Sequence, residues 1–147
     1  MSTKHEDANL ILRLYELRRE EVMRKARNWF IGEFHPGSVK EIEAAVFGEH
    51  SAYFRMVTTY WDMAASLVNN GAIDEQMFND ANGEHLAVYA KLEPFINEIR
   101  ATPGREHYMA HLEKVVMRIP NASEKMSAFR ERIKQMTAAR AEAASKG

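Results

Sequence analysis

The stretch that decides the fold is YFRMVTTYWDMAASLVNNGAIDEQMF, residues 53–78. At about 100° per residue on a helical wheel, the apolar residues from Tyr53 to Val68 cover more than half of the circumference. A helix that is apolar over so wide an arc is surrounded by other helices. Gly71 then provides a helix stop and Asp74 an N-cap, so a second helix follows after a short turn. The stretch therefore predicts two consecutive helices at the centre of a bundle.

The apolar spacing is helical along the rest of the chain as well. No segment combines β-branched residues with a period of two, so no strand is predicted. We expect six helical segments, at residues 8–30, 39–47, 51–69, 74–99 and 106–118 and in the segment that follows Asn121. The prediction is an all-α, single-domain helical bundle of five to six helices, with the third and fourth helices central.

Length and composition support one packed domain. The chain has 147 residues, of which 46% are apolar and 10% aromatic. A chain of this size buries about 70% of its unfolded surface on folding, so it needs no cross-links. We expect residues 1–7 and 138–147 to be flexible, because the first are polar and the last are rich in alanine outside the apolar pattern.

The absence of cysteine and of long apolar runs restricts the cellular setting. The 147 residues include no cysteine, which excludes disulfides, thiolate metal sites and cysteine nucleophiles. The start MSTKHED has no apolar core of a signal peptide. No run approaches the ~20 apolar residues that span a bilayer. These features predict a soluble cytoplasmic protein that does not insert into a membrane.

Charge is distributed unevenly, although the formal net charge is only −1. Residues 13–27 and residues 121–147 each hold six basic and three acidic side chains, whereas residues 28–120 hold seven basic and thirteen acidic ones. The basic outer helices either complement an acidic centre or form a surface for nucleic acid. Acidic residues are interspersed in both basic segments, which favours the first interpretation.

Four residues of the two central helices are candidates for a ligand site. His85 falls within the apolar stripe of the helix at 74–99, where an imidazole needs a partner or has a lowered pKa. Asp62 and Arg55 lie on the polar strip of the preceding helix, and Trp61 belongs to its aromatic arc. The alternative is structural, since a core histidine usually bonds a neighbouring helix and an Asp or Arg often clasps two helices.

The sequence predicts no metal and no cofactor. His107 and His111 have the i, i+4 spacing of two imidazole ligands, but no further ligands accompany them. No Glu-x-x-His occurs on any predicted helix, so a ferritin-like site is not expected. Phosphate-binding loops, dinucleotide-binding glycine motifs and nucleophile elbows are also absent.

Two apolar stripes exceed what a small core requires. They lie on the first and last helices, and we predict them as an oligomer interface formed by Leu10, Leu14, Leu17, Met126, Phe129, Ile133 and Met136. The stripe of the first helix also rotates midway, which suggests that this long helix contacts two different partners.

Part of the chain resembles a known family. The motifs are YWDMAA at 60–65, NGAIDE at 70–75, Phe78, PFI at 94–96 and Arg100. Over residues 50–105 they resemble an uncharacterised bacterial family of small helical domains of unknown function. The resemblance implies a helical fold and a bacterial source, and brings no activity. Many members carry an N-terminal membrane segment, whereas residues 10–17 are too short and are interrupted by charges.

The sequence favours a non-enzymatic protein–protein interaction or scaffold module that forms a homo-oligomer. One alternative is a nucleic-acid-binding protein that uses the basic first and last helices. The other is a small-ligand or enzymatic site between the central helices, around His85 and Asp62.

Overall fold

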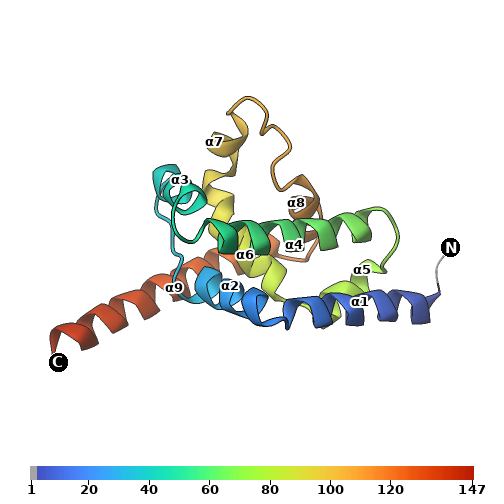
Figure 1. The fold of residues 1–147 in the computed structure, drawn as a ribbon, viewed down its shortest axis with the longest axis horizontal. Coiled ribbons are helices and arrows are strands. Elements are labelled where there is room, and N and C mark those ends of the chain that lie inside the picture. The colour runs from blue at the N-terminus through green and yellow to red at the C-terminus, as the bar shows by residue number, and fades with distance from the viewer. Residues whose placement is uncertain (1–2) are drawn as a thin grey trace.

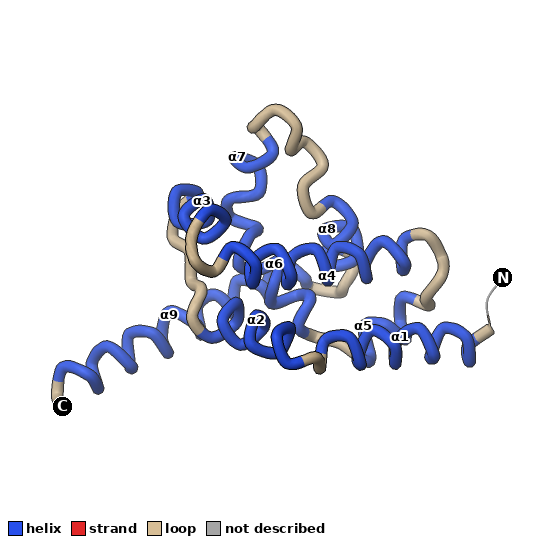
Figure 2. Tube along the Cα trace, in the orientation of Figure 1, coloured by secondary structure: helices blue, strands red, loops and turns tan. Residues whose placement is uncertain are grey.

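The computed structural model describes residues 3–147, in which every regular element is a helix (Figures 1 and 2). In chain order the elements are α1 (Lys4–Arg18), α2 (Glu21–Gly32), α3 (Val39–Phe47), α4 (Ser51–Asn69), α5 (Glu75–Ala81), α6 (Glu84–Leu92), the 3-10 helix η1 (Glu93–Phe95), α7 (Ile96–Arg100), α8 (Ala110–Met117) and α9 (Ala122–Ser145). The all-α class is confirmed. The predicted number of five to six helices is too low, because two predicted helices are broken.

The first predicted helix is divided into α1 and α2. The break is at Glu20, whose backbone is extended and whose carboxylate accepts hydrogen bonds from the amides of Val22 (3.0 Å) and Met23 (2.9 Å). Glu20 therefore caps α2, although Ser, Thr, Asp and Asn are the usual N-caps. The rotation of the apolar stripe marks this break, and the prediction of one continuous helix was wrong.

The fourth predicted helix is divided at its two weakest points. Asn82 and Gly83 separate α5 from α6, and the Asn82 amide donates to the Phe78 carbonyl at 3.0 Å. Pro94 lies in the 3-10 turn between α6 and α7, as expected of a residue that cannot donate to a helix. The fifth predicted helix begins at Ala110, four residues later than expected.

The predicted stop at Gly71 and cap at Asp74 are confirmed, and Ser38 caps α3 in the same way as Asp74 caps α5. The Ser38 hydroxyl accepts from the Glu41 amide at 3.3 Å, the Asp74 carboxylate accepts from the Met77 amide at 2.9 Å, and Gly71 has a φ of 82°. Asn121 precedes α9 but does not cap it. Its side chain makes no capping bond, and its own backbone adopts the left-handed conformation.

Helix α4 is the hub of the molecule. It packs against α2, α3, α5, α6 and α8. Its buried residues cover an arc of about 160° and include Phe54, Val57, Trp61 and Ala64. Helix α6, from the fourth predicted helix, packs against α2, α4, α8 and α9. The predicted centre of the bundle therefore corresponds to α4 and α6.

Helix α9 lies against α6 with its first turns only. Ala122 and Met126 are buried, whereas every residue from Lys134 onward is exposed. The far end projects from the body, and the two chain ends lie at opposite ends of the long axis (Figure 1). The flexibility of residues 138–147 and 1–7 stays a prediction, and residues 1 and 2 lie outside the described residues.

The membrane prediction agrees with the helices that are described. Within residues 3–147, no helix combines the length and the apolar character that crossing a bilayer requires.

Candidate functional site

His85 is buried in α6 and lies among aromatic rings. It is 1% exposed, and its ring centroid is 5.7 Å from that of Trp61 and 5.0 Å from that of Phe78. The Nε2 atom is 2.9 Å from the Asn79 Oδ1 atom, which assigns the imidazole proton to Nε2. Burial lowers the pKa of His85 to about 4, so the ring is neutral at pH 7.

Asp62 caps a neighbouring helix. Its Oδ1 atom accepts a hydrogen bond of 3.0 Å from the backbone amide of Leu112, in the first turn of α8. The residue before α8, Met109, has a φ of 57° and offers no side-chain cap. The carboxylate from α4 thus fills the role of an N-cap and places a negative charge near the positive end of α8.

Replacing Asp62 with alanine is expected to lower the free energy of unfolding by about 1 kcal/mol, as for the loss of an N-cap. Asp62→Asn retains the acceptor oxygen and is expected to cost less. Urea unfolding of both variants measures the difference. An unchanged Asp62→Ala variant, or equal losses in the two variants, would contradict the capping role.

The four candidate residues do not converge on one site. Trp61 is buried beside His85, Asp62 points to α8, and Arg55 is exposed on the surface of α4. Two buried nitrogens, Trp61 Nε1 and His85 Nδ1, have no hydrogen-bond partner among the described residues. None of the four residues lines either of the two principal cavities.

Some residues of the two predicted oligomer stripes belong to the core. Leu14 and Met126 are buried, and Phe129 packs against the core. Ile133 lines a cavity. The members that remain exposed are Leu10 (38%), Leu17 (45%) and Met136 (47%).

A partly buried ion cluster joins α1, α2 and α6. The Glu84 carboxylate accepts hydrogen bonds from Arg27 Nε at 3.0 Å to each oxygen, and from Arg27 Nη2 at 2.6 Å. Arg18 Nη1 lies 3.9 Å from the same carboxylate. The hydrogen bonds that Arg27 donates to Glu84 raise the pKa of Arg27. Arg18 ends α1, Arg27 lies in α2, and both contact the carboxylate at the start of α6. These charge-assisted contacts therefore hold the two helices on either side of the break against α6.

The most unusual side chain is Lys91, which the sequence did not single out. The residue is 5% exposed, and its ammonium donates to the carbonyl oxygens of Phe30 (2.7 Å), Ile31 (2.9 Å) and Phe34 (2.6 Å). It also lies 3.1 Å from Nδ1 of His35. Burial lowers the pKa of Lys91 to about 7. The carbonyls belong to the end of α2, so a cation from α6 caps that helix.

His35 completes this arrangement as a neutral imidazole. With its proton on Nε2, the ring donates to the Gly32 carbonyl at 3.2 Å and accepts from Lys91 at Nδ1. Burial, followed by the charges of Lys91 and Arg140, lowers the pKa of His35. The cap and the imidazole form one wall of a cavity of about 440 Å³ between the α2–α3 loop, the end of α6 with η1, and α9.

Sequence reasoning had little chance of finding Lys91. It lies at the margin of the α6 stripe, where a lysine usually extends its stem along apolar surface and keeps its charge in water. The useful signal is its position inside Val88–Leu92, a run that is buried throughout. The carbonyls that accept from the ammonium lie at and just after the end of α2, about 60 residues earlier in the sequence. The sequence around Lys91 does not show that they come close.

Metal binding finds no support in the geometry. Among residues 3–147, no group of three or more histidine, aspartate or glutamate side chains is arranged to hold an ion. His107 and His111 do not share one helix, because α8 begins at Ala110.

Comparison with known proteins gives a family. No curated protein and no solved structure matches the chain. One family model matches residues 3–119 of the chain. This segment is longer than the residues 50–105 expected from the motifs, and it ends before α9. It includes both the His85 core and the Lys91 cap. The chain belongs to the family described as "Domain of unknown function (DUF4760)", as the resemblance to an uncharacterised family of small helical domains indicated.

Proposed function

We propose that this chain is a non-enzymatic interaction module that associates with a second copy of itself through the outer surface of α1. One observation carries the proposal. Of the nine large apolar side chains that are exposed in residues 3–147, five come from the short stretch 10–22: Leu10, Leu12, Tyr15, Leu17 and Val22. Four of these side chains belong to α1 and Val22 belongs to α2. Exposed apolar side chains are therefore more frequent here than on the rest of the described surface, as at many interaction sites.

The pattern on α1 suits a second copy. At about 100° per residue, Leu10 and Leu17 lie on one edge of the exposed face and Leu12 on the other, with Arg13 and Glu16 between them. In an antiparallel pair of α1 helices, Leu10 faces Leu17 of the partner and each Arg13 approaches a Glu16. A two-fold interface requires this kind of self-complementarity. Because both signs of charge are present, the pair does not repel itself.

The placement of the polar candidates supports a non-enzymatic role. Asp62 is occupied by the Leu112 amide, and His85 lies within 6 Å of two aromatic rings with its Nε2 bonded to Asn79. A catalytic pair needs its two groups within reach of one substrate. The enzymatic alternative therefore has less support than self-association.

Self-association is testable by molar mass. At about 100 µM we expect light scattering to report a dimer, and the double variant Leu10→Glu/Leu17→Glu to report a monomer because four carboxylates then meet in the interface. Phe47→Glu is the control, since Phe47 is 81% exposed on α3, away from α1. Leu14→Glu is unsuitable, because Leu14 is buried and a charge there disrupts the core.

A monomeric wild-type protein at that concentration would contradict the proposal, as would a control variant that dissociates to the same extent. Circular dichroism of each variant shows whether the helices are retained.

Nucleic-acid binding through the basic outer helices is the second alternative. Basic side chains of the outer helices pair with neighbouring carboxylates, as in Arg13–Glu16 (3.7 Å) and Lys25–Glu21 (3.5 Å). These exposed pairs reduce the positive potential that phosphate groups require. The bacterial source and the cytoplasmic location likewise stay predictions.

A further inference from the structure

The cavity beside Lys91 has the size and lining of a small-molecule site. Its volume of about 440 Å³ is within the ~300–1,000 Å³ of such sites. Rigid apolar side chains form much of its lining, namely Pro36, Pro94, Phe95, Phe129 and Ile133. These residues come from the α2–α3 loop, η1 and α9, so three separate segments enclose the space.

The polar part of the lining is predominantly cationic. Lys91, Arg130 and Lys134 line the cavity, together with a single acidic side chain, Glu131. Arg130 is also paired with Glu93, so Lys134 is the basic side chain of the lining that is exposed to a ligand. The three N–H groups of Lys91 are shared among four nearby acceptors, so none is free for a ligand. Burial lowers the pKa of Lys91 to about 7, so its contribution to the potential at pH 7 is a partial charge. Lys134 is exposed on α9 and is available to a ligand at the rim.

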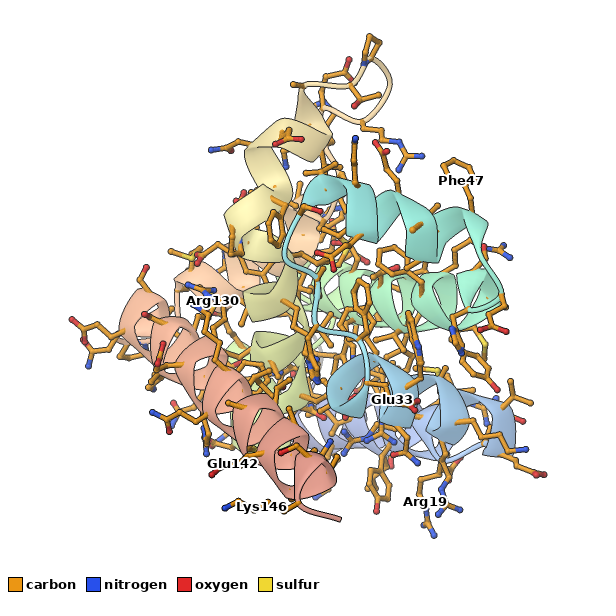
Figure 3. The ribbon with its side chains drawn as sticks, turned by 90° about the vertical axis from the view of Figure 1, so that its left-hand side faces the viewer. Arg19, Glu33, Phe47, Arg130, Glu142 and Lys146 are labelled. Carbon is orange, nitrogen blue, oxygen red and sulfur yellow. The ribbon has the colours of Figure 1, made fainter. Side chains whose placement is uncertain are left out.

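Arg130 fixes α9 against the rest of the wall. Its Nη1 atom donates to the Ala90 carbonyl at 2.9 Å and lies 3.2 Å from the Glu93 carboxylate. In Figure 3, Arg130 lies on the side of α9 that faces the α6–η1 segment. With Met126 fully buried nearby, these contacts hold the apolar wall of α9 in place. The wall that α9 contributes to the cavity is therefore held in position by specific contacts.

The neutral state of His35 is a second sign of the positive potential. Lys91 and Arg140 both disfavour its protonation, after burial. A negatively charged ligand entering the cavity would be stabilised by the same cations.

We propose that this cavity binds a small organic anion with an apolar or aromatic body. The body packs between the proline and phenylalanine side chains, and the carboxylate or sulfonate lies at the rim near Lys134. One wall belongs to α9, which follows the family match at residues 3–119. The site is independent of self-association through α1.

A matched pair of fluorescent probes tests both halves of the proposal. Anilinonaphthalene sulfonate has an aromatic body and one negative charge, and N-phenylnaphthylamine is the same body without the sulfonate. With the full chain at pH 7 and low salt, we expect one saturable site for the sulfonate probe and at least about tenfold weaker binding of the neutral one.

Charge variants on α9 locate the site. Lys134→Glu is expected to weaken binding of the sulfonate probe about fivefold and to leave binding of the neutral probe unchanged. Glu131→Lys is expected to strengthen binding of the sulfonate probe. Lys125→Glu makes the same charge change on the same helix outside the cavity, so it is expected to have little effect. Ile133→Asp should abolish binding of both probes.

Three results would overturn the proposal. They are equal affinity for the two probes, equal effects of Lys134→Glu and Lys125→Glu, and retention of binding by Ile133→Asp. If Ile133→Asp loses its helical circular dichroism, the comparison of the two lysine variants decides the matter, because both lysines are exposed.

Discussion

Replacing Lys91 with methionine is expected to lower the free energy of unfolding by about 3 kcal/mol. Methionine fills the same space with an apolar stem but donates no hydrogen bond. The carbonyls of Phe30, Ile31 and Phe34 then lose their donor in a buried place. Relief from burying an ammonium offsets part of this loss, since burial has already lowered the pKa of Lys91. The net effect is still large, because three acceptors are left unsatisfied.

Urea unfolding of Lys91→Met measures the loss, with Lys125→Met as a control at an exposed lysine, where a change within about 0.5 kcal/mol is expected. Hydrogen exchange adds a local observation. The amides of Glu33, Phe34, His35 and Gly37 should exchange faster in Lys91→Met, because the end of α2 loses its cap. A loss below about 1 kcal/mol would mean that water replaces the ammonium at these carbonyls.

The central helix was predictable because one physical rule determines it. An arc of apolar residues as wide as that of α4 is compatible only with a buried helix, and a capping aspartate and a glycine at positive φ fix the turn after it. Breaks in the helices were less predictable. Asn82, Gly83 and Pro94 are weak helix formers, but whether a helix is interrupted there depends on how much packing its two halves gain separately.

The break at Glu20 was beyond local reasoning. A glutamate is a poor signal for an N-cap, and its role depends on Arg18 and Arg27 converging on Glu84 from another part of the chain. The same applies to the cavity, whose cations and apolar side chains come from three segments. Sequence periodicity predicts which face of a helix is buried. It does not predict which end of a distant helix will contact that face.

The buried imidazole of His85 is expected to make folding stability depend on pH between about 4 and 6.5. The pKa of this group is about 4 in the folded protein and 6.5 in the unfolded chain. Between these values the unfolded chain binds more protons, so stability falls as the pH is lowered. The contribution is fully present above pH 6.5 and is fully lost below pH 4. The difference of about 2.5 pKa units corresponds to about 3 kcal/mol.

The surroundings of His85 explain why protonation is so unfavourable. Trp61 of α4 and Phe78 of α5 cover the ring, and neither stabilises a charge as water does. Glu84, which precedes His85 in α6, is already shared by two arginines, and burial alone accounts for the lowered pKa of His85. Asn79 accepts from the neutral ring and gains little from the charged one.

Comparing His85→Gln with the wild type separates this group from the others that titrate, including His35, whose lowered pKa acts in the same direction. Glutamine does not titrate and can still donate to Asn79, so the variant should lose less stability between pH 7 and pH 4.5. We expect the two curves of unfolding free energy against pH to converge toward acid. An NMR titration in which the His85 ring protonates near pH 6.5 would contradict the argument, because a buried ring with no charged partner has no means of holding the proton that firmly.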